Sequence, residues 1–111
     1  MDLLEEKVGA VTVVAVKGRV DSTTAPALGE RLTANLAALK VRVVLDLSRL
    51  EYISSAGFRV LLLAAKRADE TGSRFVVCGI SGKVRQLFDL GGFLDLFTIV
   101  GSREEGIAAA Q

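Results

Sequence analysis

The sequence predicts a single α/β domain over residues 1–111. We expect a mixed, mainly parallel sheet of four or five strands, with an antiparallel hairpin at one edge and about four helices. Two observations support this prediction. The chain has 111 residues and is 50% hydrophobic, which suits one domain with its own core. Short apolar runs typical of strands alternate with segments whose apolar residues recur at helical spacing, and no Pro/Gly/Ser-rich linker interrupts them.

The first third of the chain contains the predicted hairpin and the first helix. Two strands are expected to join at Lys7 to Gly9, and the second, Val11 to Val16, is apolar at nearly every position, as in a strand covered on both faces. The first strand is shorter and more polar, which suits an edge. Residues 18–23 are predicted to form a loop. Pro26 and the leucines that follow it at helical spacing predict an amphipathic helix over residues 25–39.

A strand and a second helix follow. Residues 41–47 show the period-two pattern of a strand. After a short connection, a second helix is predicted to end at Gly72. Its apolar face contains Phe58, Leu61, Leu62, Ala65 and Ala68.

The last third continues this alternation. Residues 74–80 predict a buried strand, and Ser81 is expected to cap a third helix that ends at Gly91–Gly92. Residues 96–100 predict a last short strand. The segment SREE, residues 102–105, has the spacing of a capping box and predicts a final helix.

Composition argues against several classes of function. The formal net charge is +1 and the basic residues are spread along the chain, so we expect no direct nucleic-acid binding. The chain has no histidine, the commonest general base and metal ligand, and we expect neither a metal nor a cofactor. The single cysteine, Cys78, lies in an apolar run and is expected in the core.

The same features predict a location. One cysteine cannot form an internal disulfide, which favours a reducing compartment. The N-terminus starts acidic and lacks the pattern of a signal peptide, and the longest apolar runs are far shorter than the roughly 20 residues that span a bilayer. We therefore expect a cytoplasmic protein without a membrane span.

Three loops are expected to meet at the carboxyl ends of the parallel strands, where functional loops gather in such sheets. They are GRVDSTT at residues 18–24, EYISSAG at 51–57 and GISGK at 79–83. The last differs from a nucleotide-binding P-loop, because two residues separate its glycines instead of four and Val84 follows the lysine. Asp21 in the first loop is either a turn residue or a functional carboxylate.

The paired serines Ser54 and Ser55 lie where a strand turns into a helix, and several roles place serine there. A nucleophile elbow requires Gly-x-Ser-x-Gly, which is absent, and the usual histidine base is missing too. A Ser–Lys pair remains formally possible. A helix cap and a phosphorylation site both fit, since Ala56 and Gly57 leave the surface around the hydroxyls open.

Three segments together resemble the anti-sigma factor antagonists of the STAS-domain family. They are KGRVDSTTAPAL, LDLSRLEYISSAG and GSRFVVCGISGKVRQLFDLGGF. The resemblance implies a protein that is not an enzyme and that binds a cognate anti-sigma factor, which is also a serine protein kinase, and so releases a sigma factor. It also implies that this kinase phosphorylates one serine of the antagonist, that the phosphate blocks binding, and that a phosphoserine phosphatase restores activity.

The resemblance also implies site residues. Counting back from Gly57 places the phosphorylated serine at Ser55, with Ser54 as a secondary candidate; Ser54 stands where the family often has aspartate. Asp21 matches a loop aspartate near that site. The implied partner-binding residues are Asp21, Ser22, Thr23, Ser54, Ser55, Ala56, Gly57 and Phe58.

Two alternatives remain. One is a STAS subunit without a phosphorylation switch, structural in a lipid-transport or stress-sensing complex. The other is a small serine hydrolase, against which the missing histidine argues.

Overall fold

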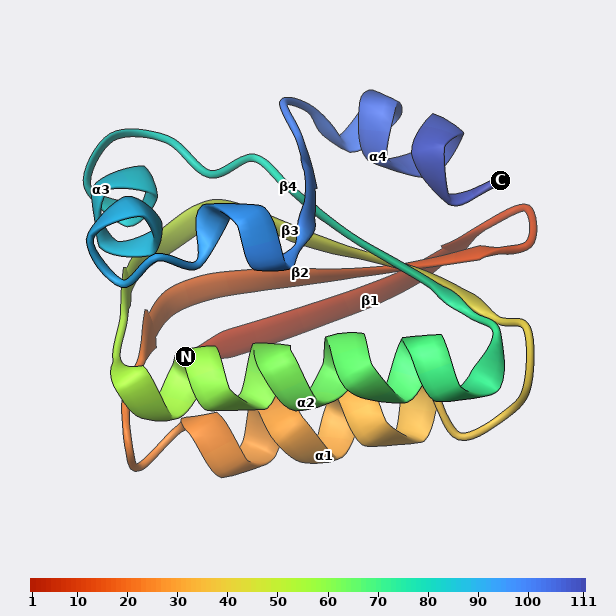
Figure 1. Cartoon of the computed structure of the whole chain (residues 1–111), viewed down its shortest axis with the longest axis horizontal. Coiled ribbons are helices and arrows are strands. Elements are labelled where there is room, and N and C mark those ends of the chain that lie inside the picture. Colours follow the sequence, from red (N-terminus) through yellow and green to blue (C-terminus); the bar gives the residue numbers. More distant parts are fainter.

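The computed structural model describes all 111 residues of the chain. It contains one five-stranded sheet, four α-helices and a single 3-10 turn (Figure 1). In chain order the elements are β1 (Asp2–Val8), β2 (Val11–Val20), α1 (Ala25–Asn35), β3 (Arg42–Ile53), α2 (Ser55–Thr71), β4 (Arg74–Cys78), α3 (Gly82–Leu90), η1 (Leu94–Leu96), β5 (Thr98–Val100) and α4 (Arg103–Ala110).

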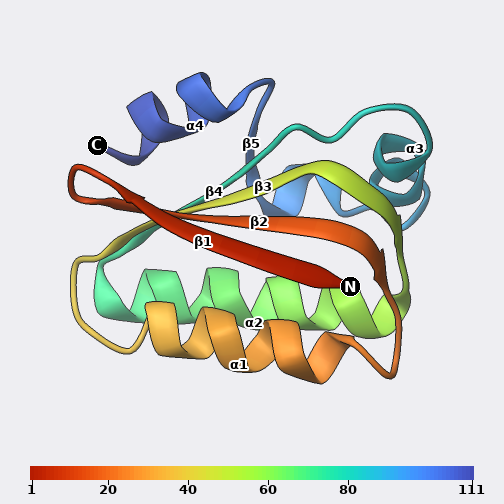
Figure 2. The ribbon, with the colours of Figure 1, turned by 180° about the vertical axis from the view of Figure 1, so that it is seen from behind.

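The sheet has the strand order β1-β2-β3-β4-β5. Strands β1 and β2 pair antiparallel, and every other neighbouring pair is parallel. Helices α1 and α2 lie side by side on one face of the sheet and α4 covers part of the other, as the two opposite views show (Figures 1 and 2). The predicted mixed, mainly parallel sheet with an antiparallel edge hairpin is confirmed.

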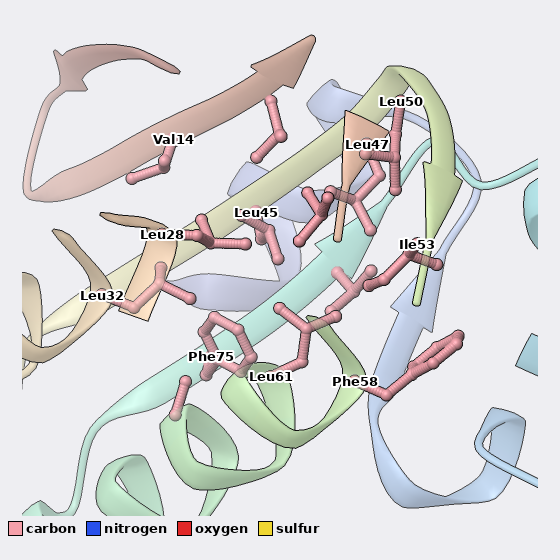
Figure 3. Packing of buried hydrophobic residues seen from close by; sticks show 14 of the residues in the cluster. Val14, Leu28, Leu32, Leu45, Leu47, Leu50, Ile53, Phe58, Leu61 and Phe75 are labelled. Atoms are coloured by element: carbon pink, nitrogen blue, oxygen red, sulfur yellow. The ribbon is translucent and has the colours of Figure 1, made fainter. Parts of the chain in front are cut away.

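Two hydrophobic clusters fill the layers between sheet and helices. The larger, of 21 buried residues, lies between the sheet and α1 and α2, and Figure 3 shows Leu28, Leu45 and Leu61 meeting there. The smaller, of six residues, lies under α4 and includes Val44 and Cys78. Alternate residues in the first half of β3 face the two clusters, so a sheet covered on both sides explains why the inner parts of β2, β3 and β4 are apolar at nearly every position.

Three elements of the first half end elsewhere than the sequence predicts. The strand expected over residues 41–47 is β3, which continues to Ile53, so residues 51–53 of the expected loop belong to the strand. Residues 18–20, expected in a loop, continue β2, because irregularities in the β2–β3 ladder bend both strands while they stay paired to the end. The first helix ends at Asn35 and not at residue 39. Leu39, the last leucine in the helical pattern, is 72% exposed. The chain turns there through Lys40, whose φ is 56° and whose amide donates to the carbonyl of Thr71.

The helix termini confirm some predictions and correct one. Gly72 ends α2 in the left-handed conformation, with φ of 66°, and Ser102 caps α4 by accepting a hydrogen bond from the Glu105 amide at 3.1 Å. Ser81 precedes α3 at the cap position, but its side chain makes no capping hydrogen bond. The buried face of α2 also differs slightly, since Ala64 is buried there while Leu62 and Ala65 are only half-buried.

The first turn of α2 packs very closely on the ends of two strands at Gly57. A Cβ atom added to Gly57 would lie 2.6 Å from Cγ1 of Ile53 and 2.8 Å from Cγ1 of Val20. The amide of Ser54, just before the helix, donates to the carbonyl of Val20 at 2.8 Å. A residue without a side chain is therefore needed at position 57 for the helix to begin where it does.

Gly57→Ala should destabilise the domain, even though alanine within a helix is more favourable than glycine by about 1 kcal/mol. The added methyl group overpacks the contact with Ile53 and Val20, and such overpacking costs about 1–3 kcal/mol. Urea denaturation measures the free energy of unfolding of both proteins.

Gly29→Ala is the matched control, because Gly29 is also helical but its added Cβ would meet only Val60, at an ordinary 3.5 Å. This variant should be as stable as the original protein or more so, by up to about 1 kcal/mol. If Gly57→Ala proves as stable as Gly29→Ala, the close contact does not restrict position 57.

Candidate functional site

Two loops lie together at the carboxyl end of the sheet, as expected. The connection from β2 to α1 contains Asp21, and the connection from β3 to α2 contains Ser54. The last residues of the two strands, Val20 and Ile53, are partners in the ladder, and the Ser54 amide bonds to the Val20 carbonyl. Figures 1 and 2 show the two connections side by side. Strand pairing therefore brings Asp21 and the two serines to one edge of the molecule.

The two serines differ in their hydrogen bonding. Ser54 is the N-cap of α2: its backbone is extended, its side chain is half-buried, and its Oγ accepts from the amide of Gly57 at 3.3 Å. Ser55 is the first residue of the helix and is exposed, and its hydroxyl forms no hydrogen bond within the protein. The capping role is thus confirmed for Ser54, which leaves the Ser55 hydroxyl accessible for another use.

Asp21 organises the loop that precedes α1. Its Oδ1 accepts from the amide of Thr23 at 2.9 Å and from the hydroxyl of the same residue at 2.7 Å. It also accepts from the amide of Thr24 at 3.2 Å. The hydrogen bond from the Thr23 hydroxyl, together with those from the two amides, lowers the pKa of Asp21 below its ordinary value. Asp21 therefore has the predicted turn role and is a charged carboxylate at neutral pH.

The structure divides the remaining residues implied for partner binding into accessible and buried ones. Ser22 and Thr23 are exposed and Ala56 is half-buried. Gly57 is buried, and the ring of Phe58 is only 4% exposed. The placement of Gly57 and Phe58 on an accessible surface is therefore corrected.

The Phe58 ring belongs to an aromatic cluster. It stacks on Phe93 with 4.2 Å between ring centroids, and it meets Phe88 edge-on at 4.8 Å. Figure 3 shows the ring at the C-terminal end of β3, near Ile53. The helical periodicity that placed Phe58 on an apolar face already indicated burial. Its role at this edge is to hold the first turn of α2 against the segment around α3.

The third loop does not reach the level of the other two. Strand β4 ends at Cys78, which pairs with Asp46, whereas β3 continues to Ile53. Gly79 lies against Ser48, so that an added Cβ would be 2.9 Å from the Ser48 amide nitrogen. The expectation that all three loops meet at one rim is wrong for residues 79–81, because β3 extends beyond its neighbour β4.

Two residues at the site were missed from sequence. The guanidinium carbon of Arg19 lies 4.4 Å from the centroid of the Tyr52 ring, a cation–π contact between partners in the β2–β3 ladder. The sequence prediction placed Arg19 in a loop, where no register could be assigned to it. The apolar and β-branched run ends at Val16, and the polar residues Lys17 and Arg19 with Gly18 gave no signal for a longer strand.

The rest of the molecule offers little for chemistry. No group of three or more histidine, cysteine, aspartate or glutamate side chains could hold a metal ion. Cys78 is fully buried, as expected, and burial raises the pKa of its thiol to about 12, so it remains protonated at neutral pH. None of the helices combines the length and the apolar character needed to cross a membrane.

Thr23→Ala should raise the pKa of Asp21 toward its ordinary value, because the variant loses the 2.7 Å hydrogen bond from the Thr23 hydroxyl. A carboxyl group whose pKa is lower in the folded state stabilises that state. The full contribution is present at pH values above the pKa of the unfolded state, about 3.9, and it is lost as the pH falls through the pKa of the folded state. The variant should therefore lose less stability than the original protein on acidification below about pH 4. An NMR titration of the Asp21 carboxyl group measures the pKa directly.

Ser22→Ala is the control for this titration, because Ser22 is exposed and makes no hydrogen bond to Asp21. An identical Asp21 pKa in Thr23→Ala and the original protein would show that the hydroxyl does not determine it.

Comparison with known proteins shows close relatives of this sequence. The sequence profile of the STAS domain matches residues 3–106. The candidate anti-sigma factor antagonist BtrV of Bordetella bronchiseptica is 40% identical over 109 residues, which cover 98% of this chain and 94% of that protein. The crystal structure of an anti-sigma factor antagonist from Mycobacterium paratuberculosis matches with a TM-score of 0.83 at 30% identity, covering 98% of this chain and 92% of that one.

The fold extends to more distant proteins. The phosphorylated form of the Bacillus cell fate determinant SpoIIAA matches with a TM-score of 0.72 at 17% identity, covering 99% of this chain and the whole of that one. At this identity the similarity shows a shared fold alone. Since the STAS profile and the relative from Bordetella each match nearly the whole chain, this protein belongs to the STAS domain family.

Proposed function

We propose that this protein is an anti-sigma factor antagonist whose binding is switched off by phosphorylation of Ser55. Its partner would be a cognate anti-sigma factor that is also a serine protein kinase, and a phosphoserine phosphatase would reverse the modification. One observation carries the proposal. Of two adjacent serines at the start of α2, Ser54 is engaged as the cap, while the Ser55 hydroxyl is exposed and makes no hydrogen bond.

The relatives support the general role. The Bordetella and Mycobacterium proteins are both named as anti-sigma factor antagonists, and the match covers nearly the whole of each chain. SpoIIAA, which shares the fold, has been determined in phosphorylated and unphosphorylated forms. A domain with this fold can therefore carry a phosphate. An antagonist of a bacterial transcription regulator would act in the cytoplasm.

The start of α2 suits a phosphate chemically. The first amides of a helix have no partner within the helix, and the helix dipole places partial positive charge there. Ser55 is the first residue of α2, so a phosphate on its Oγ would lie in this favourable field. Phosphorylation adds about −1.5 to −2 charges at neutral pH. The isolated domain should tolerate that charge at this position.

The same charge would oppose partner binding. The accessible residues of the two loops at this edge include Ser22, Thr23 and Ala56, and Asp21 in the same loop as Ser22 is charged. A partner that covers this surface must remove the phosphate from water, which is costly unless the partner supplies opposite charges. The phosphate also adds bulk where the partner would lie. We infer that the modification weakens the complex and leaves the fold intact.

Ser55→Ala should abolish phosphate incorporation by the cognate kinase, because the acceptor oxygen is removed while the cap at Ser54 stays in place. Radioactive phosphate transfer and mass-spectrometric site mapping provide the measurement. Ser54→Ala is the comparison variant: it should be destabilised by about 0.5–2 kcal/mol through loss of the cap, yet still accept phosphate. Phosphate found on Ser54 in the Ser55→Ala protein would contradict the assignment. A kinase that modifies neither serine would favour the alternative of a STAS subunit without a switch.

Ser22→Trp should weaken binding to the unphosphorylated partner at least tenfold, because a large side chain would obstruct the surface beside Ser55. Ser22 is exposed and makes no hydrogen bond, so the melting temperature should stay the same. Ala108→Trp is the matched control, since Ala108 is exposed on α4, which covers the opposite face of the sheet. Titration calorimetry measures both affinities. If only the Ala108 variant lost affinity, the partner surface would lie on α4 instead.

A further inference from the structure

Arg59 lies one helical turn after Ser55 on the exposed side of α2. Residues four apart in an α-helix are neighbours, with Cβ atoms about 5–6 Å from each other. Both side chains are exposed. None of the three ion pairs in the protein involves Arg59, and the first turn of α2 contains no acidic residue with which it could pair. A solvated guanidinium group without a partner thus stands beside the serine.

We propose that Arg59 binds the phosphate on Ser55 within the same chain; this rests on the proposed function, in which Ser55 is the modified residue. A guanidinium group can donate two parallel hydrogen bonds to phosphate oxygens, and such charge-assisted pairs are among the strongest hydrogen bonds in proteins. The spacing of four residues places the two groups within reach without any change of the backbone. Arg59 is then the residue that recognises the modification inside the molecule.

Other groups around Ser55 are less suited to this role. The amide of Gly57 is already bonded to Ser54, and Arg19 lies over the ring of Tyr52. Lys66, a cation further along the exposed side of α2, lies eleven residues after Ser55, or about 16 Å along the helix axis. Arg59 is therefore the cation that the helix itself places next to the acceptor.

Acidic residues on the neighbouring elements oppose a second negative charge. They are Asp21 in the β2–α1 loop, Glu30 on α1 and Glu51 on β3. Their repulsion would raise the pKa of a phosphate at Ser55, whereas Arg59 would lower it. Because these acids are unchanged in a variant of Arg59, a comparison between the two proteins isolates the effect of the guanidinium group.

The pairing would change the binding surface in two ways at once. The phosphate adds negative charge at Ser55, and Arg59, which is solvated in the unmodified protein, turns onto it. A partner that contacts this surface would meet a new anion and also lose access to a cation. The modification would thus alter the surface over a full helical turn and not at one atom.

The test uses protein with phosphoserine placed at position 55 during translation, so that it needs no kinase. A ³¹P NMR titration then measures the second pKa of the phosphate, which is about 6 in an unperturbed phosphoserine. In Arg59→Gln this pKa should be higher than in the original sequence by a few tenths of a unit, as expected for an exposed helical pair. Arg59→Lys should give an intermediate value, because lysine keeps the charge but not the two-pronged geometry.

Lys66→Gln is the matched control, since it removes one positive charge from the same helix far from the phosphate. An equal shift in Lys66→Gln and Arg59→Gln would show a general effect of net charge and overturn the proposal. An unchanged pKa in Arg59→Gln would overturn it as well. Neither result bears on whether the kinase modifies Ser55, which is decided separately by site mapping.

Discussion

The close approach of α2 to the ends of β2 and β3 is the constraint on which the site depends. Gly57 fits against Ile53 and Val20 because it has no side chain, and the Ser54 amide bonds to the Val20 carbonyl at the same point. These contacts fix where the helix begins and hold the Asp21 loop beside it. The exposure of Ser55 is therefore a consequence of core packing two residues further along the helix.

The paired serines solve two different physical problems. A helix start leaves amides without partners, and the side chain of Ser54 turns back to satisfy one of them. A residue that caps in this way is half-buried and its oxygen is engaged, which makes it a poor acceptor for a kinase. The next residue points to solvent and does no structural work at the helix end. Two adjacent hydroxyls would thus allow the helix to remain capped while Ser55 carries the proposed phosphate.

The sequence predicted the sheet well and the ends of its strands and helices less well. The alternation of apolar runs predicted the order of strands and helices along the chain and the edge hairpin, because period and polarity reflect burial directly. It could not show that β2 reaches Val20, since that depends on bulges in the ladder with β3. The sequence predicted caps at both Ser81 and Ser102, and only Ser102, which has the glutamate of a capping box three residues later, makes the capping hydrogen bond. The sequence analysis assigned Phe58 both to an apolar helix face and to the partner surface. Its stacking on Phe93 places it in the core.

If Ser55 is phosphorylated as we propose, the electrostatics around it explain how the phosphate would act as a switch without unfolding the domain. Asp21 is held in its charged form by hydrogen bonds from its own loop, so an added phosphate meets repulsion from that side. The amides at the start of α2 and the guanidinium of Arg59 act in the opposite direction, and both are present before modification. A domain whose acceptor site already contains these opposing charges need not rearrange when the phosphate arrives. The energetic cost would then fall on a partner that must bury the modified surface, and the proposed phosphate would act by weakening binding.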